Sequence, residues 1–328
     1  MASLSSNDLE YYKDQCKAFS DALEMYFDNE KPGHHSVERK NAFFLTDALT
    51  HYPFPHNDSL KEMFISRYKK AIKQIKETKV EKGVVIWNLY NMSYIVKIKN
   101  ITIAFDLIRF TPALIKEGEE DLHKKILREL VELCDILFVS HNHDDHADPY
   151  VAQEFLLQNK PVIAGNDIFA EENFSAKVTR LHPDGIKREF IVPNINIKIL
   201  LRIYPGHQAI APNVPIDNNF TVITLDDNIS IAHSGDQCWE NDFKWIDSVY
   251  KDVDVDVLMI NTWTLSPERL TKGVRPKIIL PGHVNEMSHE IISRVPFWKS
   301  YNNWKNEGDK VVHLFWGESY KYGKTNSE

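Results

Sequence analysis

The chain has 328 residues, of which 43% are hydrophobic and 26% are charged, so it carries enough apolar material for one large core or two moderate ones. Its formal net charge of −8 lacks the basic surplus used to bind phosphate backbones, and we expect no nucleic-acid partner. No segment approaches the roughly 18 apolar residues of a membrane-spanning helix and the first residues show no leader pattern, so we predict a cytoplasmic protein without a transmembrane segment. The three cysteines match no disulfide or metal-binding spacing and are predicted to be free thiols.

Residues 1–83 are predicted to form an N-terminal helical region. Apolar residues recur at near-helical spacing in 7–27 and in 59–79, and loops containing proline and glycine join the helical parts. The six lysines within 69–82 are interpreted as a solvated helix face. Two roles for this region stay open from the sequence: a lid over the active cleft, or a contact between copies in a homo-oligomer.

Residues 84–328 are predicted to form the second domain, because short β-branched and aromatic runs begin at residue 84. Strand runs then alternate with helical segments, which favours layered sheets covered by helices. One helix has a well-specified start, with Asp148 as the N-cap and Pro149 in the first helical position. The other predicted elements, in chain order, are strands at 84–90, 93–99 and 101–107, a helix at 119–132, strands at 136–139 and 161–165, a helix at 167–176, strands within 178–204, a hairpin at 220–236, a helix at 242–250, strands at 255–260 and 278–280, an aromatic-rich helix, a last strand at 311–316, and a frayed end at 321–328.

The most informative segment follows the predicted strand at 136–139 and has the pattern HxHxDH. It contains His141, His143, Asp145 and His146. Residues two apart in an extended segment project to the same side, so His141 and His143 can hold one cation together, while Asp145 and His146 lie beyond the turn and point elsewhere. The pattern therefore predicts a metal site and makes a pair of metal ions the natural arrangement.

Further ligands for such a pair stand after three other apolar runs. They are His207 in YPGHQ, Asp236 in IAHSGD and His283 in ILPGHV, each beside glycine or proline, where a loop leaves a sheet. Each alone would be interpreted as a turn or core residue. Together with HxHxDH, all three are predicted metal ligands.

With this set of residues the chain resembles the metallo-β-lactamase fold superfamily, over about residues 84–315. The resemblance implies an α/β fold with four layers, an αββα sandwich of two mixed sheets flanked by helices, to which the N-terminal helical region is appended. It also implies how the ligands are shared: His141, His143 and His207 hold one metal ion, Asp145, His146 and His283 hold the second, and Asp236 bridges the two.

Two more residues are expected to support this site without binding metal. Asp106, at the end of the run 101–107, matches the early strand-end aspartate of the superfamily, which supports the ligands from behind. His233 stands three residues before Asp236 and within a strand run, so it is interpreted as a packed or supporting histidine rather than a ligand.

This ligand set predicts a metal-dependent hydrolase. Nitrogen and oxygen ligands without a thiolate suit Zn, with Mn and Fe as alternatives. A hydroxide bridging two divalent metal ions would attack a small ester, lactone or phosphodiester, and Asp145 beside it is the candidate catalytic residue that orients it or receives its proton. The segment VSHNHDDHAD is most similar to the branch that contains L-ascorbate-6-phosphate lactonase and N-acyl-phosphatidylethanolamine phospholipase D.

Two other functions stay open from the sequence. A non-catalytic metal-binding or scaffold protein would have the same fold, but it predicts lost ligands, and no ligand position is lost. A lipid-directed phosphodiesterase would reach a membrane surface through Trp298, Trp304 and Trp316 or through the Lys-rich helix. Such aromatics are more often core residues, and the overall charge opposes anionic membranes. The basic residues in 272–277 would suit an anionic substrate, but a solvated loop is the preferred interpretation.

Overall fold

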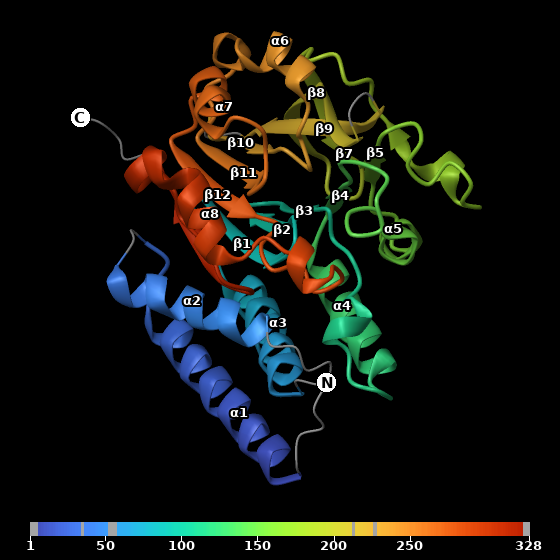
Figure 1. The fold of residues 1–328 in the computed structure, drawn as a ribbon. Helices are drawn as coiled ribbons and strands as arrows, with labels where there is room; N and C mark the ends of the chain where they lie inside the picture. The colour runs from blue at the N-terminus through green and yellow to red at the C-terminus, as the bar shows by residue number, and fades with distance from the viewer. Residues whose placement is uncertain (1–5, 34–35, 52–57, 212–213, 226–227, 324–328) are drawn as a thin grey trace.

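The computed structural model describes residues 6–33, 36–51, 58–211, 214–225 and 228–323 (Figure 1). No helix within these ranges is long and apolar enough to cross a membrane. In chain order, the α-helices are α1 (Ser6–Asn29), α2 (Val37–Thr50), α3 (Asp58–Glu77), α4 (Glu120–Leu133), α5 (Pro149–Leu157), α6 (Phe243–Ile246), α7 (Pro267–Val274) and α8 (Phe297–Trp304).

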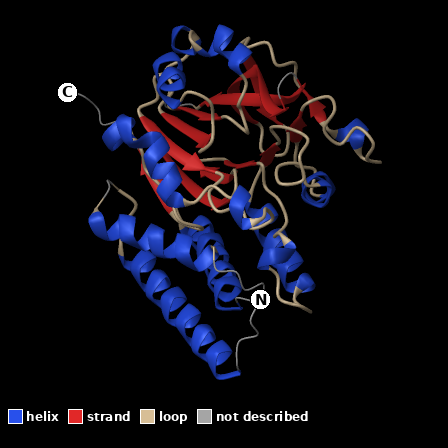
Figure 2. Cartoon of the chain, in the orientation of Figure 1, coloured by secondary structure: helices blue, strands red, loops and turns tan. Residues whose placement is uncertain are grey.

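The described strands form two sheets (Figure 2). In chain order, they are β1 (Val84–Tyr90), β2 (Ser93–Lys97), β3 (Thr102–Phe105), β4 (Ile136–Phe138), β5 (Val162–Ala164), β6 (Thr179–Arg180), β7 (Arg188–Val192), β8 (Ile197–Ala211), β9 (Val214–Thr224), β10 (Ser230–His233), β11 (Val257–Asn261), β12 (Ile278–Gly282) and β13 (Ser319–Tyr322). The first sheet has the order β13-β1-β2-β3-β4-β5-β6, and the second has the order β12-β11-β10-β9-β8-β7.

Both sheets are mixed. In the first, β13, β1, β2 and β3 pair antiparallel, whereas β3 to β6 are parallel. In the second, β7 to β10 pair antiparallel and β10 to β12 are parallel. The carboxyl ends of parallel strands open onto loops at one edge of a sheet, which is where ligands bind in open α/β sheets.

Three apolar cores separate four layers. The middle core lies between the two sheets and contains Ile86, Phe105 and Ile231. The alternate side chains of the first sheet, such as Trp87, belong to a second core with α1 to α5. The third core covers the outer side of the second sheet and contains Phe243 of α6 and residues of α7. Figure 1 shows α1 to α3 on one side of the sandwich and α6 and α7 on the other, which confirms the predicted αββα fold with helices appended at the N-terminus.

The N-terminal helices are tied to the sandwich by buried polar groups as well as by apolar packing. Arg39 of α2 forms a buried ion pair with Glu318 at 2.5 Å. Asp47 of α2 accepts hydrogen bonds from Asn285 Nδ2 at 2.7 Å and from the backbone N–H groups of Phe297 at 2.7 Å and Trp298 at 2.9 Å. Burial raises the pKa of Asp47 to about 6, even though all three hydrogen bonds lower it. The helical region thus holds the segment that follows β12.

Two predicted helices are absent or much shorter. Residues 167–176 form turns and the start of a short 3₁₀ segment, because Phe169 has φ of 59° and a left-handed residue cannot continue a right-handed helix. The segment 242–250 contains only the four-residue α6 with 3₁₀ turns on either side. It is interrupted at Ser248, whose φ of −126° is not helical. Helix α7 was not anticipated from the sequence; it contains Lys272, which was expected in a loop.

The predicted last strand at 311–316 is wrong. The segment makes one isolated bridge, between Val311 and Ile279, and the true last strand is β13, which includes part of the end that was expected to be frayed. Its apolar character has another cause: the segment crosses the layers. Val311 belongs to the outer core of the second sheet, Leu314 to the core between the sheets and Phe315 to the core under the N-terminal helices. Continuous burial therefore gave it the composition of a strand without the pairing.

Candidate metal centre

The HxHxDH segment and two strand-end residues meet at the carboxyl ends of the parallel strands. Residues 141–146 follow β4, Asp236 follows β10, and His283 follows β12. The backbone adopts the left-handed conformation at two of these ends, where Gly235 has φ of 52° and His283 has φ of 61°. A Cβ at Gly235 would collide with Asn218, so a glycine is needed next to Asp236.

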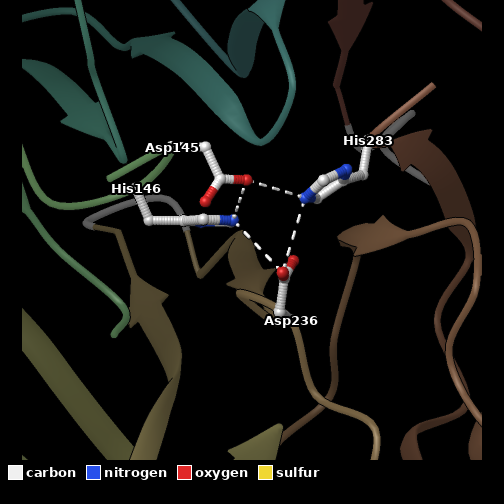
Figure 3. A group of neighbouring side chains, drawn as sticks. All are labelled: Asp145, His146, Asp236 and His283. Carbon is white, nitrogen blue, oxygen red and sulfur yellow. Dashed lines mark ion pairs between the residues drawn. The ribbon is translucent and has the colours of Figure 1, made fainter. Parts of the chain in front are cut away.

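A first group of possible metal ligands contains four side chains, Asp145, His146, Asp236 and His283 (Figure 3). Asp145 Oδ2 lies 3.3 Å from His146 Nε2 and 3.2 Å from His283 Nε2. Asp236 Oδ2 lies 3.3 Å from His146 Nε2 and 3.4 Å from His283 Nε2. The two carboxylates and two imidazoles therefore alternate around a small space, as Figure 3 shows, and each aims one ligand atom into it.

A second group shares Asp236 with the first and adds His141 and His143. His141 Nε2 lies 3.1 Å from His143 Nδ1 and 3.7 Å from Asp236 Oδ2. His141 is fully buried, whereas His143 is partly exposed. The structure therefore brings six of the seven residues predicted as ligands into two adjoining groups, with one carboxylate common to both.

The donor set of these groups fits divalent cations. His146 Nε2, Asp236 Oδ1 and His283 Nε2 are buried and have no hydrogen-bond partner among the described residues. Leaving buried polar atoms unpaired costs about 1–3 kcal/mol each, so they are expected to have a ligand. The four nitrogen or oxygen atoms of the first group and the three of the second, without a thiolate, suit Zn, Mn or Fe.

The pKa shifts of the cluster also agree with a cation at this place. Burial alone would raise the pKa of Asp236, but His146 and His283 outweigh it and hold the pKa below its ordinary value. Burial would lower the pKa of His283, but Asp236 and Asp145 raise it to about 10. His141 differs, since burial, with a contribution from His146, lowers its pKa to about 3. Two carboxylates buried together thus require positive charge, which protons or cations can supply.

Asp106 supports the first group from behind. It directly follows β3 with φ of 43° and is fully buried. One of its oxygens accepts a hydrogen bond from His146 Nδ1 at 2.7 Å and from Ser140 Oγ at 2.6 Å, and the other accepts from the Ser140 N–H at 2.7 Å. This fixes the ring of His146 with Nε2 directed at Asp145 and Asp236.

His233 lies outside both groups. Its Nε2 is 2.9 Å from the carbonyl oxygen of Met92, and its ring stacks on Phe105 with centroids 5.0 Å apart. His233 Nε2 lies 3.9 Å from Asp106 Oδ2, so His233 packs behind the residue that supports His146.

His207, which is predicted to bind metal beside His141 and His143, belongs to neither group of possible ligands among the described residues. Its Nδ1 lies 2.7 Å from Asp242 Oδ1, and its N–H donates to the other oxygen of Asp242 at 2.8 Å. The sequence YPGHQ was interpreted as the end of a strand, but β8 continues to Ala211 through these residues. His207 therefore lies in a continuing strand, where neighbouring side chains point to opposite faces.

Gln208, the next residue, faces the cluster in its place. Its Nε2 donates to Asp236 Oδ2 at 3.1 Å, and its Oε1 has no hydrogen-bond partner in the described part of the chain. The alternation of side chains along a strand is the signal that could have identified it, had the full length of β8 been recognised.

Glu286 is a second residue near the centre that sequence reasoning missed. It is 2% exposed, three residues after His283, and its Oε2 lies 3.6 Å from His283 Nδ1 and 3.0 Å from His289 Nδ1.

A cavity of about 310 Å³ opens over the centre. Its lining includes His143, Asp145, Gln208, Asp236, Trp263, His283 and Glu286.

Two solved structures with a similar fold are named as hydrolases. No family model matches the chain, and no curated protein gives a significant match. Igni18, a metallo hydrolase from the archaeon Ignicoccus hospitalis, is 17% identical with a TM-score of 0.53, over 74% of this chain and 99% of that one. An isothiocyanate hydrolase from Delia radicum gut bacteria is 13% identical with a TM-score of 0.54, over 73% of this chain and 100% of that one. At these identities the likeness concerns the fold alone.

Proposed function

We propose that the protein is a metal-dependent hydrolase of small esters, lactones or phosphodiesters, with two divalent cations that share Asp236. The observation that carries this proposal is the pair of ligand groups with one carboxylate in common, at the strand ends and open to a cavity. Among the described residues, buried atoms without a hydrogen-bond partner on His146 and His283 support the first group, and such an atom on Asp236 supports both groups.

In this proposal the first group holds one cation and the second group holds the other. The cations would supply Lewis acidity, which makes water a nucleophile near neutral pH and stabilises an oxyanion. Zn fits the ligands, with Mn and Fe as alternatives.

The protein side chains hold and orient the reactants. Asp145 is partly exposed and lines the cavity, so its carboxylate can accept a hydrogen bond from an entering water and receive its proton. Asp106 fixes the ring of His146, and Trp263 packs edge-on against His283 with centroids 5.6 Å apart. These contacts limit the motion of two proposed ligands.

The lipid-directed alternative loses most of the support that the tryptophans gave it. Trp304 is 1% exposed and Trp316 is 2% exposed, so neither reaches a membrane surface, and Trp298 at 50% is the exposed one of the three. The similarity to the lactonase and phospholipase D branch, an anionic substrate, a homo-oligomer and a cytoplasmic location stay predictions.

The decisive experiment measures metal content and hydrolysis together. Protein purified without chelator is expected to contain about two equivalents of metal by elemental analysis and to cleave bis(p-nitrophenyl) phosphate or a member of a lactone panel. Chelation should abolish turnover, and the added metal should restore it. Asp236→Ala should lose metal from both groups together with turnover.

Asp217→Ala is the matched control, because Asp217 is an exposed aspartate on the neighbouring strand β9. It should keep both metal and turnover. A folded wild-type protein that contains no metal and takes up neither Zn nor Mn would overturn the proposal and favour a scaffold without a metal.

A further inference from the structure

A second cavity, of about 420 Å³, adjoins the metal centre and is separate from the cavity directly above it. Asp145 lines both cavities. The second one extends from Asp145 toward α4 and the loop after β3, and its size is typical of a pocket for a small organic ligand.

The walls of this second cavity are mostly apolar. They are formed by side chains that are buried or partly buried and that come from three separate segments of the chain. These side chains are Tyr90, Ile108, Phe110, Ile115 and Leu127. Such a surface gains free energy by covering the apolar part of a ligand.

His123 of α4 adds a polar side chain without a described partner to the lining of this cavity. The side chain is 4% exposed, yet neither Nδ1 nor Nε2 has a hydrogen-bond partner among the described residues. Its ring packs edge-on against Phe110, with centroids 4.8 Å apart. Burial lowers the pKa of His123, which keeps the imidazole neutral near pH 7 with one donor and one acceptor nitrogen.

Charged groups of both signs line the cavity, and the acidic ones outnumber the basic ones. Arg109 and Lys124 stand among the lining residues with Glu120, Asp144, Asp145 and Asp148. Arg109 is engaged by Asp148, with Nε 2.8 Å from Oδ2. With two basic and four acidic side chains around it, the cavity disfavours an anion, and its apolar walls favour an uncharged group.

We propose that this cavity is the pocket for an uncharged apolar part of the substrate, in which a hydroxyl, ether or carbonyl oxygen forms a hydrogen bond with His123. The inference rests on the proposed function, since it places the scissile bond on the Asp145 side of the pocket. The substrate class is then an ester, lactone or phosphodiester with a medium-sized aromatic or alkyl group that carries one polar atom.

Binding of 1-naphthol, an uncharged aromatic probe with one hydroxyl, tests the pocket without any chemical step. Calorimetry on the wild-type protein, both metal-loaded and chelator-treated, should detect one site. In His123→Leu the affinity for 1-naphthol should fall about fivefold, the usual effect of one lost hydrogen bond. The affinity for 1-methylnaphthalene, which lacks the hydroxyl, should stay or rise.

Ile115→Trp fills the pocket from its partly buried wall and should weaken both probes more than about tenfold. Ile191→Trp is the matched control, because Ile191 is 57% exposed on β7 and does not line the pocket. Equal binding by wild type, Ile115→Trp and His123→Leu, with circular dichroism showing folded proteins, would overturn the inference.

Hydrolysis of 1-naphthyl acetate to naphthol and acetate separates this inference from the proposed function. If wild type and Ile115→Trp cleave the ester with the same KM, the proposed hydrolase is supported and the proposed pocket is contradicted. The opposite result is also possible to recognise. If Ile115→Trp abolishes naphthol binding but no metal-loaded sample cleaves this ester, bis(p-nitrophenyl) phosphate or a lactone, the pocket is supported and the hydrolase is contradicted.

Discussion

The two ligand groups of the centre differ in how firmly the fold holds them. In the group of four, three side chains are buried, Asp106 fixes His146, and Glu286 lies beside His283. In the group of three, His143 is partly exposed, and the position expected for a further histidine is taken by Gln208. Ligands that are buried and held by neighbours bind metal more tightly than mobile ones. We therefore expect the group of four to bind its cation tightly and the group of three to bind its cation weakly. These groups are called the tight half and the weak half of the centre.

The largest expected effect comes from removing a ligand of the tight half. His146→Ala should weaken the tightest metal equivalent by more than about 100-fold, since it removes a buried ligand and leaves Asp106 without its imidazole partner. His143→Ala, the counterpart in the other half, should weaken the second equivalent and leave the first in place. Calorimetric titration of chelated protein with Zn checks both, and equal losses in the two variants would contradict the inequality.

A smaller effect is expected from the residue behind the ligands. Asp106→Asn keeps the shape of the side chain but removes the charge that fixes the ring of His146, so the tight half should lose about 10- to 100-fold in affinity. The weak half should change less, because His141 is linked to Asp106 only through Ser140 Oγ, which lies 3.0 Å from His141 Nδ1 and 2.6 Å from Asp106 Oδ2. The same titration gives both constants. Loss confined to the weak half would show that Asp106 supports the other group.

The weak half can be strengthened instead of removed. Gln208→His places an imidazole where an amide faces Asp236, and imidazole is the better ligand for Zn. The second equivalent should bind roughly tenfold more tightly, with little change in the first. An unchanged second constant would mean that position 208 does not reach the cation.

His207 should have the smallest effect on metal. His207→Ala is expected to leave both equivalents bound, because the side chain contacts Asp242 and not the cluster. It should cost about 1–3 kcal/mol of unfolding free energy in urea denaturation, since buried Asp242 loses a partner. A metal content that falls while the protein remains folded would restore His207 as a ligand.

The contrast between His207 and Gln208 shows what the sequence could and could not predict. Residues 141–146 lie together because they are adjacent in the chain. Asp236 and His283 join them because the strands before them end where their apolar runs end. In β8, proline and glycine before His207 look like a strand end, yet the strand continues by pairing with β9. A one-residue difference then exchanges the two faces of a strand.

Features that depend on contacts between distant segments could not be predicted from the sequence. The layer-crossing segment 311–316 has the composition of a strand, and only the three cores around it explain that composition. The pocket around His123 is assembled from segments that are far apart in the chain, and a single buried histidine on a helix predicts nothing without the walls that surround it.

The hydrogen bonds of Asp47 have a thermodynamic consequence. Through Asn285, Phe297 and Trp298 they connect α2 to the segment that begins at His283, a proposed ligand. Free-energy coupling between two such places is reciprocal, so a cation that orders His283 also favours the docked state of α2, and a change that loosens α2 lowers affinity for the cation by the same factor. The helices added to the sandwich then become a control point for metal occupancy, although they contribute no ligand to either group.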